Sequence, residues 1–287
     1  EEKEVTAEFK KGTSGRFAPG LPAKGDGQLL FMLNGLAKLK DDGQMVIIQN
    51  GSSLFNGDAG SGPSEIRRYL IENDWLDAIV QLPNNAFYNT GIATYIWIVM
   101  KNKPVTHQGK VQLIDASACC AARRKNIGSK NVDITKACCD LIIEAYGAYV
   151  DGTYNGVDEN DNAIIVKSKV MDAIDLGYNK IVVETPQLDE DGNVVMKKKK
   201  PVADTSKRDT ENVPLAEDID AYFEREVIPY NPQAWIDKAK TKVGYEIPFT
   251  RTFYEYKQIE PSDVIAARIE EHEKSLMAKL HDLFGGE

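Results

Sequence analysis

The chain has 287 residues, of which 42% are hydrophobic and 28% charged, and its net charge is −9. This is an ordinary soluble globular composition for one large or two ordinary domains. No run approaches the ~20 apolar residues that cross a bilayer, so a protein with transmembrane helices is excluded. The negative charge argues against a simple nucleic-acid coat protein, although an enzyme that leaves most phosphate contacts to a partner is compatible with it.

The four cysteines form two adjacent pairs, at 119–120 and 138–139, without a Cys-x-x-Cys or zinc-type spacing. We therefore expect free thiols in a reducing, cytoplasmic environment. Three histidines are too few for a histidine metal cluster, so no metal site is expected. The chain opens on Glu-Glu-Lys-Glu, without a signal peptide or an initiator Met, and we expect it to be processed or part of a longer polypeptide.

The first fifty residues predict a loop, a helix and a strand. Residues 1–25 are polar and rich in Gly, Lys and Pro, which is typical of a loop. Asp26 fits the N-cap of an amphipathic helix whose apolar residues, Phe31 among them, continue to about residue 40. Residues 45–49 predict a strand, and the polar residues Asn50 and Ser52 follow it directly.

A glycine-rich loop at 57–62 comes next, and Pro63 and Glu65 then fit the first turn of a second helix. Strand, glycine loop and helix are also the parts of a phosphate-binding cradle. The loop lacks the Gly-Lys-Ser/Thr ending and does not match Gly-x-Gly-x-x-Gly. We expect a mobile loop, with nucleotide binding as the alternative.

Residues 77–100 contain two short apolar runs, 77–82 and 93–100, which predict buried strands. The polar loop between them carries Phe87 and Tyr88. These rings are well placed either to cap the sheet core or to meet a planar ligand. The connection is too short for a parallel crossover, so an antiparallel hairpin at the sheet edge is expected.

The alternation of helices and strands predicts a doubly wound α/β sheet. Residues 111–115 predict the strand that finishes it. A basic patch at 123–125 follows, and then a helix over 134–149 whose cysteines fill the core.

We expect three regions. Residues 1–150 form the α/β domain, and residues 151–214 form a loop-rich insertion around one short β element at 178–184. Residues 215–287 form a helical C-terminal region. Its last helix begins near Ser262, and its apolar residues form a seam compatible with a heptad, which needs the main domain or another subunit to pack against.

Several stretches resemble the modification (methyltransferase) subunit of type I restriction–modification systems. They are GDAGSGPSEIRRYLIEN at 57–73, DWLDAI at 74–79, FYNTGIATYIWI at 87–98 and GYEIPFTR at 244–251. The resemblance covers nearly the whole chain in the same order. It implies a Rossmann-like fold and transfer of a methyl group from S-adenosylmethionine to N6 of adenine in DNA. It also implies a DNA-specificity subunit and a motor/nuclease restriction subunit as partners.

Two motifs of that family are missing from the sequence. We find neither the glycine loop that holds the methionine part of the cofactor nor the Asn/Asp-Pro-Pro-Tyr/Phe tetrapeptide that holds the target amine. The nearest substitutes, YNPQ at 230–233 and LPNN at 82–85, lack the second proline and the aromatic. The resemblance therefore implies the C-terminal portion of the subunit, with no catalytic residue of its own, and neither cofactor binding nor activity is expected of the chain alone.

The resemblance carries over few site residues. Phe87 matches the aromatic that stacks on the extruded adenine, which offsets the base stacking lost from the duplex. Phe31 matches an apolar residue beside the adenine of the cofactor, with helix core as the open alternative. Asn50 and Ser52, at the carboxyl end of a strand, are expected to line the site. The alternative function is a non-catalytic module that docks on the specificity subunit through its terminal helix.

Overall fold

The computed structural model describes residues 2–256 and 259–284. The chain divides into two compact units, residues 1–252 and residues 253–287, and each is described by itself. None of the helices in the described residues is both long enough and apolar enough to span a membrane.

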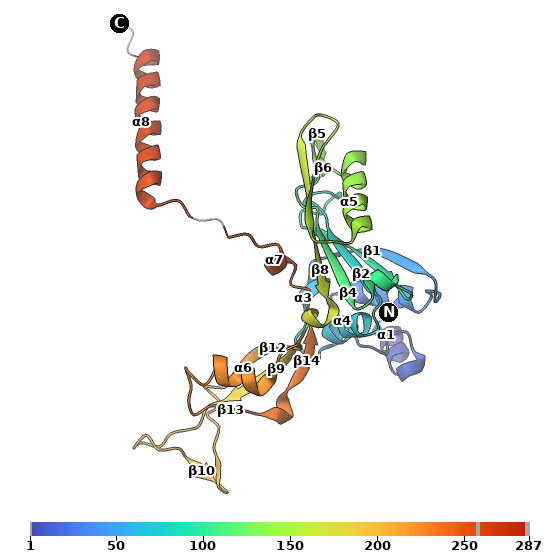
Figure 1. Cartoon of the computed structure of the whole chain (residues 1–287), viewed down its shortest axis with the longest axis vertical. Coiled ribbons are helices and arrows are strands. Elements are labelled where there is room, and N and C mark those ends of the chain that lie inside the picture. Colours follow the sequence, from blue (N-terminus) through green and yellow to red (C-terminus); the bar gives the residue numbers. More distant parts are fainter. Residues whose placement is uncertain (1, 257–258, 285–287) are drawn as a thin grey trace. The chain divides into compact units, whose positions relative to one another are not determined.

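A mixed sheet is the centre of the first unit (Figure 1). Within the described residues its six strands lie in the order β1 (Gln44–Asn50), β3 (Thr94–Met100), β2 (Leu76–Gln81), β4 (Lys110–Asp115), β8 (Ala163–Asp172) and β7 (Gly152–Val157). β2 and β4 are parallel, and the other neighbours are antiparallel. β2 has nearly continuous burial, as expected of a strand covered on both faces.

The predicted hairpin exists, but its place at the sheet edge is wrong. β3 returns antiparallel to β2 and also pairs with β1 along its full length. A strand with buried Trp97 and Val99 is better accommodated between two strands than at an edge. The prediction that 111–115 finishes the sheet is also wrong, because the long β7–β8 hairpin continues beyond β4.

Three predicted helices are confirmed as α2 (Gln28–Leu36), α4 (Gly62–Glu72) and α5 (Lys136–Ala148). α5 begins after Thr135, whose hydroxyl accepts from the Cys138 backbone N–H. Its buried face packs on the sheet, and burial raises the pKa of the neighbouring Cys119 thiol. All four cysteines lie in the described residues and are free. The predicted N-terminal loop contains a helix, α1 (Glu2–Phe9).

A second, smaller sheet forms around β9 (Gly177–Glu184), the predicted short β element. Its partners are β12 (Asp209–Pro214), β13 (Trp235–Ile236) and β14 (Lys242–Tyr245), and α6 (Ile219–Glu226) covers the buried core of this sheet. The remaining elements are α3 (Ser52–Phe55), β5 (Ala121–Ile127), β6 (Lys130–Asp133), β10 (Met196–Lys197), β11 (Lys200–Pro201) and α7 (Phe249–Thr252), and the second unit contains α8 (Ser262–Phe284).

Arg67 of α4 joins α4 to α3 and to β14 of the smaller sheet, and the residue is only 1% exposed. Its Nε donates to the Tyr245 carbonyl at 2.6 Å, and its Nη1 donates to the carbonyls of Asn56 and Ser53 at 2.9 and 3.2 Å. Burial lowers the pKa of Arg67 to about 10, so the group stays charged at neutral pH. One buried cation thus holds α3, α4 and β14 together.

We predict that Arg67→Met lowers the free energy of unfolding by about 2–4 kcal/mol, because methionine fills the space but leaves buried carbonyls without donors. Urea denaturation measures this. Arg68→Met is the matched control, since Arg68 makes exposed ion pairs with Glu65 and Glu72 and should cost at most about 1 kcal/mol. Equal losses in the two variants would contradict the role given to Arg67.

Candidate functional site

The carboxyl ends of β1 and β2 meet at the start of β3. Asn50 at the end of β1 is paired with Thr94, and the Leu82 backbone N–H just after β2 donates to the Thr94 carbonyl at 2.8 Å. β4 is parallel to β2 and ends beside it at Asp115. The turn at Asn50–Ser52 and the loop at 83–93 therefore leave the same end of the sheet, where α/β proteins bind ligands.

A hydrogen-bond network joins this strand end to the start of α2. The Gln28 Nε2 donates to Asn50 Oδ1 at 2.8 Å and lies 2.9 Å from Ser52 Oγ, while Gln28 Oε1 accepts from the Asn50 backbone N–H at 2.7 Å. Asp26 accepts from Gln28 Nε2 at 2.8 Å and from the Ser52 hydroxyl at 2.7 Å. Asn50 and Ser52 are thus brought together, as part of a larger polar cluster.

The network fixes the protonation state of Asp26. Burial raises its pKa, but hydrogen bonds from Gln28 and Ser52 outweigh burial and hold the pKa below its ordinary value. The carboxylate therefore stays ionised at neutral pH and orients both donors.

Sequence reasoning missed the role of Gln28 and misread that of Asp26. Asp26 was expected to cap the helix, whereas Gly27 occupies that position and makes no side-chain cap. The signal in the sequence is the polar pair Asp26 and Gln28 at the start of an apolar helix, together with the Asn-Gly-Ser turn at 50–52 that ends the next strand.

Phe31 lies on the outward face of α2 and is 70% exposed. The alternative that it belongs to the helix core is therefore wrong. Phe31 lines a hollow of about 880 Å³ between α1, the segment at 16–24 and α2, together with Val5, Phe17 and Leu30. This volume is within the range of small-molecule sites, and an exposed ring at its wall can contact a planar group.

Phe87 lies at the tip of the 83–93 loop and is 36% exposed, beside Tyr88 at 64%. Asn85 and Asn89 adopt the left-handed backbone conformation, with φ of 58° and 53°, and so bend the loop on either side of Phe87. Ala86 is buried beneath the tip. The loop therefore presents a partly exposed aromatic ring at the strand ends, as base stacking would require.

The glycine loop at 57–62 is exposed at Gly57, Asp58 and Gly60, whereas Ala59 is buried and Gly62 packs closely against residue 21. Gly57 and Gly60 have positive φ, and a Cβ on Gly62 would lie 1.8 Å from the Leu21 carbonyl oxygen. The Asp58 carboxylate binds Lys180 Nζ at 2.8 Å through both oxygens, which contributes to a lowered Asp58 pKa. Gly62 therefore serves a close approach of two backbone segments, and an acidic side chain occupies the loop, which disfavours the phosphate-cradle alternative.

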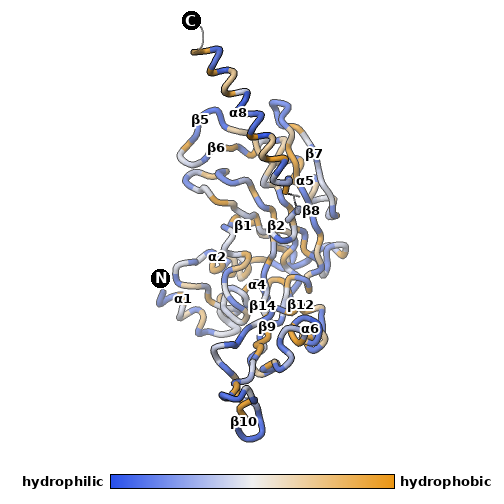
Figure 2. The backbone as a smooth tube through the Cα atoms, turned by 90° about the vertical axis from the view of Figure 1, so that its left-hand side faces the viewer, coloured by the Kyte–Doolittle hydropathy of each residue, from blue (hydrophilic) through white to orange (hydrophobic). Residues whose placement is uncertain are grey.

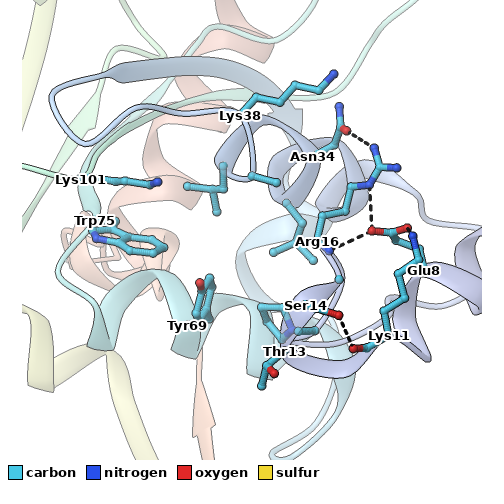
Figure 3. Close-up of a pocket in the computed structure, with 16 residues that line it drawn as sticks. Glu8, Lys11, Thr13, Ser14, Arg16, Asn34, Lys38, Tyr69, Trp75 and Lys101 are labelled. Carbon is cyan, nitrogen blue, oxygen red and sulfur yellow. Dashed lines mark hydrogen bonds and ion pairs between the residues drawn. The ribbon is translucent and has the colours of Figure 1, made fainter.

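A second hollow, of about 760 Å³, lies between the segment at 8–19, α2 and the end of α4 (Figure 3). Trp75 and Tyr69 pack edge to face there, and Lys101 Nζ is 5.6 Å from the Trp75 ring centre. Lys11 and the Arg16 backbone N–H donate to Glu8 and lower its pKa to about 2. None of the predicted site residues lines this hollow.

A search of the described residues for groups of three or more His, Cys, Asp or Glu that could hold a metal ion found none. The polar groups at the strand ends are amides, hydroxyls and single carboxylates, and they form hydrogen bonds with one another. What this arrangement can do is hold a polar ligand by hydrogen bonds and a planar one by stacking.

Comparisons with known proteins identify relatives over most of the first unit. The family model for N-6 DNA methylases matches residues 3–185. The type I restriction enzyme MjaIX methylase subunit of Methanocaldococcus jannaschii is 30% identical over 109 residues, which are 37% of this chain and 19% of that protein. The HindI methylase subunit of Haemophilus influenzae is 31% identical over 101 residues, covering 35% of this chain and 22% of that protein.

The MpnII methylase subunit of Mycoplasma pneumoniae is 31% identical over 123 residues, 42% of this chain and 21% of that protein. The crystal structure of a type I methyltransferase subunit from Streptococcus thermophilus is 26% identical, with a TM-score of 0.48, and the match covers 60% of this chain and 32% of that one. The chain thus spans about a fifth of the length of these curated relatives. The family model covers well over half of the chain, and the chain belongs to the N-6 DNA methylase family, as a relative of type I modification subunits.

Proposed function

We propose that the chain supplies the C-terminal part of a type I DNA methyltransferase, which transfers a methyl group from S-adenosylmethionine to N6 of adenine. The observation that carries this proposal is the convergence of the Asn50–Ser52 turn and the Phe87 loop at one end of the sheet, in a chain of the N-6 DNA methylase family. Residues 1–150 would belong to the catalytic domain, and residues 151–214 to an insertion whose first strands, β7 and β8, continue the larger sheet. Residues 215–287 would belong to a region that contacts a partner.

The proposed chemistry assigns binding roles to the two aromatic residues of the site. The cofactor supplies an electrophilic methyl group on a sulfonium sulfur. Direct attack of the N6 amine on that methyl group would need no nucleophilic Cys or Ser, so residues of this chain would only bind and orient the reactants. Phe87 would stack on the extruded adenine, and Phe31 would contact the adenine of the cofactor from the wall of its hollow.

A free sheet edge supports completion of the site by another segment. Among the described strands β1 pairs with β3 alone, and its outer edge has no partner. Val46 and Ile48 on one face of β1 are 64% and 48% exposed. An apolar edge strand is a template for pairing with further polypeptide. We propose that a further polypeptide segment, which carries the cofactor glycine loop and the target-amine tetrapeptide, pairs with this edge of β1.

The role of Phe87 can be tested in an enzyme completed with that segment. We predict that Phe87→Ala weakens capture of the extruded base by about 5- to 100-fold, because stacking on an aromatic is worth ~1–3 kcal/mol per base. Fluorescence of 2-aminopurine at the target position reports capture, and methylation of adenine DNA reports turnover. Tyr230→Ala, which removes an aromatic side chain 88% exposed elsewhere, is the control. Parent rates and parent fluorescence in Phe87→Ala would exclude the stacking role.

A second function, docking on a DNA-specificity subunit, is supported by α8. Its apolar seam consists of Ile265, Ile269, Leu276, Leu280 and Leu283. In the described residues no position of α8 is buried, and Figure 2 shows apolar and polar residues alternating along it. A helix of this kind is stabilised when a partner helix covers the seam.

We predict that Leu276→Asp with Leu280→Asp abolishes binding of the chain to the specificity subunit, because two charges would be buried in the seam. The matched control, Ala267→Asp with Ala278→Asp, places the same charges on the opposite face and should bind normally. Calorimetry of the two purified proteins measures both. Unchanged affinity in the seam variant would rule out α8 as the contact.

A further inference from the structure

The β5–β6 hairpin, residues 121–133, is a basic element in an acidic protein. It contains Arg123, Arg124, Lys125 and Lys130 against a single acid, Asp133, while the whole chain carries −9. The hairpin lies at the same end of the larger sheet as α5 (Figure 1). A local positive charge of this kind attracts polyanions even when the protein as a whole does not.

The hairpin is anchored on the loop that carries Phe87. The Asn131 backbone N–H donates to the Asn85 carbonyl at 3.3 Å. At the tip, Gly128 has a φ of 59°, and a Cβ there would lie 3.0 Å from the Tyr88 ring and 2.8 Å from Asn89 Oδ1. The glycine therefore lets the hairpin tip lie directly against the residues that follow Phe87. The hairpin that carries the basic residues is therefore packed against the loop that carries Phe87.

The four cations have different roles. Asp133 binds Arg123 Nη1 at 2.6 Å and Lys130 Nζ at 3.0 Å, and these bonds hold the two strands together. Arg124 and Lys125 are exposed and form no ion pair with any of the described residues. They are the cations left to bind a ligand.

We propose that Arg124 and Lys125 bind backbone phosphates of the DNA strand beside the extruded adenine. This inference rests on the proposed function, and it adds a binding surface to it. Phosphate contacts fix the position of a DNA strand on a protein, and cations on a hairpin packed against the Phe87 loop would hold the strand while the base leaves the helix. The four-lysine run at 197–200 lies on the separate β10–β11 hairpin and serves as the comparison.

The test measures binding of the chain to a fluorescein-labelled duplex with one unpaired adenine, by anisotropy over a range of salt concentrations. Arg124→Ala with Lys125→Ala should weaken binding about tenfold or more at low salt and reduce the slope of log affinity against log salt by about 2, because each lost phosphate contact removes ~0.9 from the slope. The control, Lys198→Ala with Lys199→Ala, removes the same charge and should leave the slope close to that of the parent. Urea denaturation confirms that both variants are folded.

Three results would overturn the proposal: an unchanged slope in the hairpin variant, an equal loss in the control, or no binding of this DNA by the parent chain at low salt. Phe87→Ala on a duplex with 2-aminopurine separates this test from that of the proposed function. Suppose that Phe87→Ala leaves the 2-aminopurine signal unchanged while the hairpin variant shows a reduced slope of log affinity against log salt. Phosphate binding by the hairpin is then supported, and base stacking by Phe87 is excluded. If instead Phe87→Ala changes the 2-aminopurine signal and the hairpin variant keeps the parent slope, phosphate binding by the hairpin is excluded and base stacking by Phe87 is supported.

Discussion

A buried guanidinium organises the first unit. Arg67 is inserted among backbone carbonyls of two segments, residues 53–56 and β14. Three hydrogen bonds to them offset part of the cost of burying the cation, and its Nη2 has no partner among the described residues. Two further hydrogen bonds join the same segments: the Tyr245 N–H donates to Ser64 Oγ at 3.0 Å, and the Ile247 N–H donates to the Leu54 carbonyl at 2.9 Å. Because the Ser53 carbonyl is one of its acceptors, Arg67 also fixes the turn that presents Asn50 and Ser52.

Local patterns in the sequence predicted the elements near the site well. Apolar runs predicted the strands of the hairpin, and apolar spacing predicted α2, α4, α5 and α8. These elements depend on residues close to one another in the sequence, and the spacing of their apolar residues indicates whether they form a helix or a strand. The polar loop around Phe87 was likewise predictable, because proline, asparagine and glycine interrupt the strands there.

The errors concern contacts between distant residues. Strand order depends on which edges pair, so the place of β3 between β1 and β2 could not be read from either strand alone. Arg67 reads as an ordinary helix residue, yet its nearest acceptor lies in Tyr245, 178 positions further along. Gln28 gives only a weak local signal, because apart from Asp26 its side-chain partners Asn50 and Ser52 are 22 and 24 residues away. The roles of Phe87, Phe31, Asn50 and Ser52 in a methyltransferase site remain predictions.

The proposal that the chain holds one part of a larger site depends on the family, the strand-end geometry and the edge of β1. The measurement that tests this account most directly is a calorimetric titration with S-adenosylmethionine, first of the chain alone and then of the chain mixed with a segment carrying the cofactor glycine loop and the tetrapeptide. We predict no saturable binding by the chain alone, and saturable binding once the segment is present and paired with β1. Clear binding by the chain alone would contradict the account, because it would place a complete cofactor pocket within these residues.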